Sequence, residues 1–199
     1  MNTSIKHIND LPSIDKMKKI SQGLALADAI LMPEWEYRYF SFNNNWDGNR
    51  NEMMASMRNG AGSEYFINFT KYGAVGKVLS SEFSADTSKT LKPVPDKFSS
   101  FKKEPAFNLN NATLFFWHEN DSSTWKASPN NLASYPLLGF LANGISTYTD
   151  WAENYYQKSI NHDVLKDVFT SLTVDTSQLS ILNPNLTLES LENDLNEIL

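Results

Sequence analysis

The chain has 199 residues, of which 41% are hydrophobic and 13% aromatic, and it carries a formal net charge of -6 without a cysteine. This size and composition predict one domain over residues 1–199 that buries its core without metals or disulfides. The lack of cysteine excludes disulfide frameworks, thiolate metal sites and cysteine nucleophiles, and it favours a cytoplasmic location. The negative charge argues against nucleic acid as a partner and favours a basic protein.

The first predicted element is a helix that begins after Ser13, its N-cap, and extends to Leu31, with apolar residues at spacings of three and four. Pro33 ends this helix. Asp28 interrupts its apolar run, GLALADAILM, which is therefore too short for a signal peptide. No segment approaches the roughly 18 apolar residues that a membrane helix requires, so we expect no membrane association.

Four strand-like segments follow, rich in aromatic and β-branched residues and separated by turn signals that each contain a glycine. The short links between them predict an antiparallel β-meander. The predicted strands are residues 35–42, 52–58, 64–70 and 73–79, and the turn signals are Asp47-Gly48, Asn59-Gly60 and Tyr72-Gly73.

The second half of the chain predicts an additional strand pair and then helices. Residues 80–103 are polar and contain prolines, which predicts a long excursion over the surface with a short helix at 97–103. The strand pair is residues 112–119 and 123–128, and the helical segments include those capped by Thr147 and Asn161. The order of N-terminal helix, meander, strand pair and C-terminal helices packed on the sheet is α+β.

The pattern of alternate side chains predicts the register of the second hairpin. Pairing Arg58 with Glu64 places three alternate residues of one strand on the same face as aromatic and apolar residues of the next, namely Met53, Ala55 and Met57 opposite Phe69, Ile67 and Tyr65. We interpret the methionines as core residues rather than as a soft binding surface.

The register of the first hairpin stays open at this point. A two-residue loop at Asp47-Gly48 turns Phe40 and Phe42 inward, whereas a longer, bulged loop turns inward the three residues Trp35, Tyr37 and Tyr39. The same segment alternates Asn43, Asn45 and Asp47 like a calcium loop, but the copy fails because Met54 stands where a bidentate glutamate is needed. We therefore expect no metal site there.

All three arginines lie within 21 residues, at Arg38, Arg50 and Arg58. They suit either a ligand carboxylate or phosphate, or a ladder of surface ion pairs with nearby acids, and the ladder is the favoured interpretation. We predict no catalytic residue and no cofactor, because neither a nucleophile motif nor a histidine pair appears. The candidate binding residues are the three arginines together with Trp46, Asp47 and Trp125, the two tryptophans being the best exposed candidates.

Four stretches carry a resemblance: WEYRYFSFNNNWDGNRNEMMASMRNGAGSEYFINF, GAVGKVLSSEF, WAENYYQ and LNPNLTLESLENDL. In them the chain resembles an uncharacterised bacterial family of small acidic α+β proteins. Some such proteins look like members of the broad immunity class, which protects a cell from contact-dependent or secreted toxins. The resemblance implies a non-enzymatic domain that occludes a toxin partner.

Two functions therefore remain in competition. The first is binding of a basic protein partner, steered by the acids of the last helix, which are Glu189, Glu192, Asp194 and Glu197. The alternative is a small-molecule-binding or hydrolytic protein in which Arg38 or Arg58 holds an anion in a pocket. A flat acidic face with exposed aromatics favours the first, and a deep pocket containing arginine favours the second.

Overall fold

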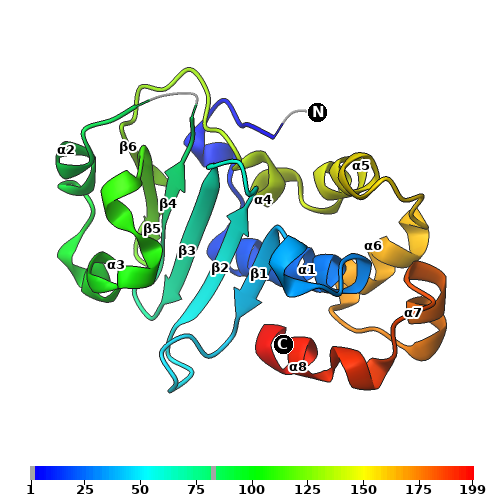
Figure 1. The fold of residues 1–199 in the computed structure, drawn as a ribbon. Helices are drawn as coiled ribbons and strands as arrows, with labels where there is room; N and C mark the ends of the chain where they lie inside the picture. The colour runs from blue at the N-terminus through cyan, green and yellow to red at the C-terminus, as the bar shows by residue number, and fades with distance from the viewer. Residues whose placement is uncertain (1–2, 82–83) are drawn as a thin grey trace.

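The computed structural model describes residues 3–81 and 84–199. Its centre is an antiparallel sheet of six strands that lie side by side in chain order. Helix α1 and the helices after the sheet cover one face, and the short helices α2 and α3 cover the other (Figure 1). This arrangement confirms the predicted α+β fold. The strands are β1 (Phe40–Asn43), β2 (Met53–Arg58), β3 (Glu64–Thr70), β4 (Gly73–Leu79), β5 (Leu114–Glu119) and β6 (Lys126–Ser128).

Helix α1 (Ile14–Leu31) is the centre of the larger core. It begins after Ser13 and stops before Pro33, as the sequence predicts, and its residues from 20 to 31 are all buried. Small residues let its neighbours approach closely, since a Cβ atom added to Gly23 would lie 2.8 Å from the Phe169 ring. The helix is therefore enclosed between the sheet and the C-terminal helices.

The second hairpin has the predicted register. Strands β3 and β4 begin and end where predicted, and Arg58 lies opposite Glu64. Ala55 and Met57 are buried under α1 and Met53 is partly buried there, which confirms that the alternate methionines belong to the core. The strand pair that follows is shorter than predicted, because β5 begins at residue 114 and β6 at residue 126.

The first hairpin differs from the predicted one in two places. Residues Trp35–Tyr37 form a 3-10 turn rather than the first half of a strand over 35–42. The connection to β2 is not a two-residue turn at Asp47-Gly48 but a loop over residues 44–52. The register left open by the sequence places Phe40 opposite Met57 and turns Phe40 and Phe42 into the core. The longer loop thus occurs with the inward pair that was expected for a two-residue loop. The Asp28 carboxylate, described below, accepts the backbone N–H groups of Tyr39 and Phe40 and explains why β1 begins only at Phe40.

The other face of the sheet has a smaller core of its own. The segment that the sequence predicts as a surface excursion forms α2 (Thr87–Leu91) and α3 (Ser99–Lys103) and inserts apolar side chains against β3 to β5. Phe98 and Phe101 of this segment, with Phe107 just beyond it, pack with Phe66 and Phe115 of the sheet. Lys77 of β4 is fully buried on this face.

Five helices complete the chain, and side-chain caps open the last three. Asn161, Asp175 and Thr187 each accept a hydrogen bond from a backbone N–H in the first turn. No helix in the described part of the chain combines the length and apolar character needed to cross a bilayer. The helices are α4 (Gly139–Asn143), α5 (Ile145–Tyr156), α6 (His162–Ser171), α7 (Thr176–Leu182) and α8 (Leu188–Ile198).

Candidate functional site

Two aromatic side chains project from the short turn that joins α1 to β1. Trp35 and Tyr37, exposed to 63% and 58%, are the most exposed large hydrophobic side chains among residues 3–81 and 84–199. Glu34 and Glu36, which alternate with them, are exposed as well. We call these four residues the 34–37 turn. Because exposed tryptophan and tyrosine are enriched at binding hot spots, the turn is the first candidate for a binding surface.

A buried carboxylate holds the end of the 34–37 turn from inside the protein. Asp28 Oδ2 accepts the backbone N–H groups of Tyr39 and Phe40 at 2.7 and 3.0 Å. Its Oδ1 accepts the hydroxyls of Tyr148 and Tyr156 of α5 at 2.8 and 2.7 Å. Burial raises the pKa of Asp28, although these four hydrogen bonds act against the shift. The chain is thus fixed where the turn enters β1.

Arg38 holds the 34–37 turn from the outside. Its Nε–H donates to the carbonyl of Met32 at 2.7 Å, and a terminal nitrogen donates to that of Pro33 at 2.6 Å. The guanidinium also forms a bidentate ion pair with Asp194 of α8, at 2.5 and 3.0 Å. Arg38, a predicted anion-binding residue, is therefore engaged in fastening the turn to α8.

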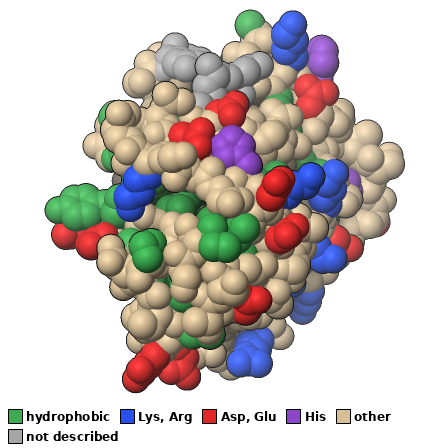
Figure 2. Space-filling view, turned by 90° about the vertical axis from the view of Figure 1, so that its right-hand side faces the viewer, with side chains coloured by type: hydrophobic (Ala, Val, Ile, Leu, Met, Phe, Trp, Pro, Cys, Tyr) green, Lys and Arg blue, Asp and Glu red, His purple; other side chains and the backbone are tan. Residues whose placement is uncertain are grey.

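Helix α8 carries further acidic side chains, of which Asp194 and Glu197 border a small cavity together with Trp35. Glu189, Glu192 and Glu197 are exposed, and within the described residues none of them forms an ion pair with lysine or arginine. The carbonyl of Glu197 accepts the N–H of Asn44, so α8 is also tied to the end of β1. Figure 2 views the side with α5 to α8 and shows acidic side chains among small hydrophobic patches.

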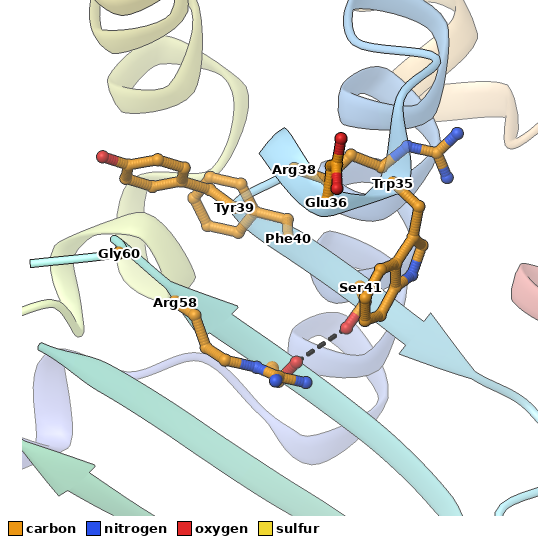
Figure 3. Close-up of a pocket in the computed structure, with 9 residues that line it drawn as sticks. Trp35, Glu36, Arg38, Tyr39, Phe40, Ser41, Arg58 and Gly60 are labelled. Atoms are coloured by element: carbon orange, nitrogen blue, oxygen red, sulfur yellow. Dashed lines mark hydrogen bonds between the residues drawn. The ribbon is translucent and has the colours of Figure 1, made fainter. Parts of the chain in front are cut away.

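An open depression of about 230 Å³ lies between the 34–37 turn and β2. The hydroxyls of Ser41 and Ser56, on neighbouring strands, are 2.6 Å apart in it. Figure 3 shows the guanidinium of Arg58 at the same end of the depression as Ser41, with Trp35 beside it, while the guanidinium of Arg38 points away. Of the two arginines expected to hold an anion, only Arg58 presents its guanidinium to the depression.

Arg58 lies opposite Glu64 but does not pair with it. The Glu64 carboxylate instead contacts the Nζ of buried Lys77 at 2.6 Å. The Arg58 guanidinium lies over the ring of Phe66, 5.2 Å from its centroid. No carboxylate in the described part of the chain forms an ion pair with Arg58, so the ladder expected from the sequence is wrong at this position.

The loop over residues 44–52 is closed by its own side chains. Asp47 accepts the backbone N–H groups of Asn49 and Asn51 at 3.1 and 3.0 Å. Although desolvation acts against it, hydrogen bonding from Asn51 and its neighbours lowers the pKa of Asp47. Arg50 is exposed at a left-handed backbone position, with φ of 59°. Across the described residues, no cluster of histidine, aspartate and glutamate suits a metal ion.

The two tryptophans predicted to be exposed are not equivalent. Trp46 is half-buried and stacks on Phe107, with ring centroids 5.7 Å apart. Trp125 is only 4% exposed, and its Nε1–H donates to the Pro12 carbonyl at 2.8 Å, so the expectation of an exposed Trp125 is wrong. The polar residues next to Trp125 in the sequence give no indication that its ring contacts the segment before α1.

The six predicted binding residues do not form one site. Arg38 and Arg58 border the depression beside the 34–37 turn, whereas Trp46 and Asp47 border another and Arg50 a third. The residues that sequence reasoning missed are Trp35, Glu36, Ser41 and Ser56. One signal was present, since acids alternate with aromatics directly after Pro33.

Comparisons with models of protein families, with curated proteins and with solved structures find no match to this chain. The function must therefore be argued from the geometry of the surface itself.

Proposed function

We propose that the protein is a cytoplasmic, non-enzymatic binding domain that occludes a basic protein partner, in the manner of an immunity protein. The contact surface is the 34–37 turn together with the acidic side of α8. The observation that carries this proposal is the exposure of Trp35 and Tyr37, 63% and 58%, on a turn that is held in place by buried and half-buried charges.

The fixed geometry of the turn favours binding. Tryptophan and tyrosine contribute large contact areas with few rotatable bonds, and ordering a loop on binding costs free energy. Here Asp28 and Arg38 already order the backbone on both sides of the turn. A partner therefore meets a preorganised pair of rings rather than a flexible loop.

The charges around the rings favour a basic partner. Glu34 and Glu36 in the turn and Glu197 on α8 are exposed and form no ion pair with lysine or arginine in the described part of the chain. Lysine and arginine side chains are attracted both to carboxylates and to the faces of aromatic rings. Such a surface also accelerates association with a positively charged protein at low salt.

Calorimetry with the purified product of a neighbouring gene, at two salt concentrations, tests the proposal. We expect binding that weakens as salt rises, because exposed charges are screened beyond roughly 10 Å at 0.1 M. The variant W35A/Y37A should weaken binding at both salt concentrations by roughly 30-fold or more. The variant E34Q/E36Q should mainly slow association and reduce the salt dependence.

Two matched controls accompany these variants. Y72A removes an aromatic ring that is 43% exposed at the turn between β3 and β4, and D163N removes an exposed acid of α6. Neither should change affinity by more than about twofold. Equal losses in W35A/Y37A and Y72A would contradict the proposed surface. No binding at either salt concentration, with turnover of a small ester, phosphate or amide in a substrate screen, would favour an enzyme instead.

A further inference from the structure

We propose that the depression between the 34–37 turn and β2 binds a carboxylate attached to an apolar or aromatic group. Arg58 provides the fork for the carboxylate, the Ser41 and Ser56 hydroxyls add a donor, and Trp35 forms a wall. This site binds an anion, whereas the acidic surface proposed above binds a basic partner.

The guanidinium of Arg58 is available because the acid opposite it on β3 is used elsewhere. Strand register places Glu64 opposite Arg58, where an ion pair across the two strands would be ordinary. Lys77, which is fully buried, instead takes the Glu64 carboxylate at 2.6 Å. A buried ammonium depends on its counter-charge much more than an exposed guanidinium does, so Glu64 stays with Lys77.

The serine pair supplies a second donor at the same place. Ser41 lies opposite Ser56, and their hydroxyl oxygens are 2.6 Å apart. One hydroxyl donates to the other, so the hydrogen of the accepting hydroxyl remains free for a third group. Ser56 and Arg58 are two residues apart on β2 and therefore face the same side of the sheet. A carboxylate on the Arg58 fork can thus also accept from the serine pair.

The charges in the depression favour a carboxylate over a phosphate. Among the described residues that line the depression, Arg58 is the only cation without an acidic partner, because Arg38 is paired with Asp194. Glu36 also borders the depression and disfavours a dianion. A single planar guanidinium matches the two oxygens of a carboxylate.

The size and the walls define the rest of the ligand. Trp35 is the exposed aromatic residue of the lining, whereas the Phe40 ring is buried in the core and the Tyr39 ring packs on Trp151. The volume of about 230 Å³ is below the roughly 300–1,000 Å³ of sites for drug-sized ligands. The site therefore suits a single ring or one side chain with its carboxylate. A free aromatic acid and the C-terminal residue of a peptide share this chemistry.

Binding of defined probes tests this site. The free acid is 3-phenylpropionate, with 3-phenylpropionamide and inorganic phosphate as comparisons. The peptide is a short uncharged one that ends in phenylalanine, with either a free or an amidated C-terminus. Calorimetry gives the affinities, and the NMR shift of the Trp35 indole N–H reports the location. We expect both carboxylates to bind more tightly than their amides and than phosphate, and the tighter of the two carboxylates identifies the source.

Variants separate the proposed contacts. R58Q should weaken carboxylate binding by about 10- to 100-fold, because it removes a charge-assisted pair of hydrogen bonds. R58K keeps the charge without the fork and should lie between R58Q and the wild type. The double variant S41A/S56A should lose roughly fivefold. R50Q, which changes an exposed arginine outside the depression, is the matched control and should bind normally.

Several outcomes would overturn the proposal. They are equal binding of acid and amide, equal losses in R58Q and R50Q, tighter binding of phosphate, and no binding of either carboxylate at millimolar concentration. Circular dichroism and thermal unfolding of R58Q exclude a folding defect as the cause of a loss. Because R58Q leaves the 34–37 turn and the acids of α8 in place, failure here is distinguishable from failure of the proposed protein-binding surface.

Discussion

Asp28 lies on the α1 side of the sheet and Lys77 on the opposite side, and both side chains are fully buried. Asp28 is surrounded by neutral donors, two backbone N–H groups and two tyrosine hydroxyls. Lys77 has a carboxylate partner, Glu64, which is still 21% exposed, and the ring of Phe66 at 5.2 Å. The buried Asp28 carboxylate is thus stabilised by neutral hydrogen-bond donors, whereas the buried Lys77 ammonium is stabilised by the partly exposed Glu64 carboxylate.

This difference shows how buried charges shape two parts of the surface. The donors on Asp28 come from the backbone that leads out of the 34–37 turn and from α5, so the carboxylate fixes the position of exposed rings. Lys77 acts by withdrawing Glu64 from the residue opposite it and thereby leaves Arg58 without a carboxylate. Substitutions at the two buried residues should therefore differ in size and in what they do at the surface.

The largest effect is expected for D28A, which leaves four buried or partly buried donors without their acceptor. We expect the free energy of unfolding to fall by about 3–5 kcal/mol, measured by urea denaturation. D15A, which removes an exposed acid of the same helix, should cost less than about 1 kcal/mol. A loss in D28A no larger than that in D15A would contradict the role of the buried carboxylate.

A smaller effect is expected for K77M, since Glu64 can be hydrated once its partner is gone. We expect a loss of about 1–3 kcal/mol in the same measurement. The freed Glu64 carboxylate should then pair with Arg58 opposite and weaken binding of 3-phenylpropionate. In K77M/E64Q the affinity should return toward that of the wild type. Unchanged affinity in K77M would show that Lys77 does not control the availability of Arg58.

The pH dependence of stability should also distinguish Asp28. Its folded-state pKa is raised above the ordinary value of 3.8 by burial, so the unfolded chain releases this proton first as pH increases. The contribution of Asp28 to stability should therefore fall as pH rises from 3.8 through the folded-state pKa, and stay constant above it. The difference in unfolding free energy between wild type and D28N, measured along a pH series, isolates this residue. A difference that grows with pH would show that the four hydrogen bonds outweigh burial.

The smallest effect on stability is expected for W35A. The side chain is 63% exposed, so its removal should change the free energy of unfolding by less than about 0.5 kcal/mol. The same variant should weaken binding of a basic partner, because the lost ring belongs to the proposed contact surface. A large loss of stability in W35A would mean that Trp35 serves the fold rather than recognition.

The sequence predicts most of the fold where local signals agree. Strands 64–70 and 73–79 have the predicted bounds because alternation, β-branched residues and a glycine turn all favour the same register. Segment 35–42 has strand-like residues throughout, yet its first part is a 3-10 turn because Asp28 and Arg38 hold the backbone there. Both residues act through contacts that strand propensity does not describe.

The candidate site is less predictable for the same reason. Arg38 pairs with an acid 156 positions away, and Glu64 pairs with Lys77 rather than with the arginine in register. The sequence places all three arginines together but does not indicate that, among the described residues, only Arg38 of the three pairs with an acid. Burial of Lys77 depends on apolar residues between 94 and 112, yet the prolines and polar residues of segment 80–103 favour a surface path.

The ion pair between Arg38 and Asp194 also sets an order of events during synthesis. The 34–37 turn is made early, but the acid that fastens it to α8 follows 156 residues later, which at cellular elongation rates is a delay on the order of 10 s. During that interval the nascent chain carries the two aromatic rings without their anchor on α8. The proposed contact surface is therefore complete only after translation has passed Asp194, so incomplete chains that end before it lack this ion pair.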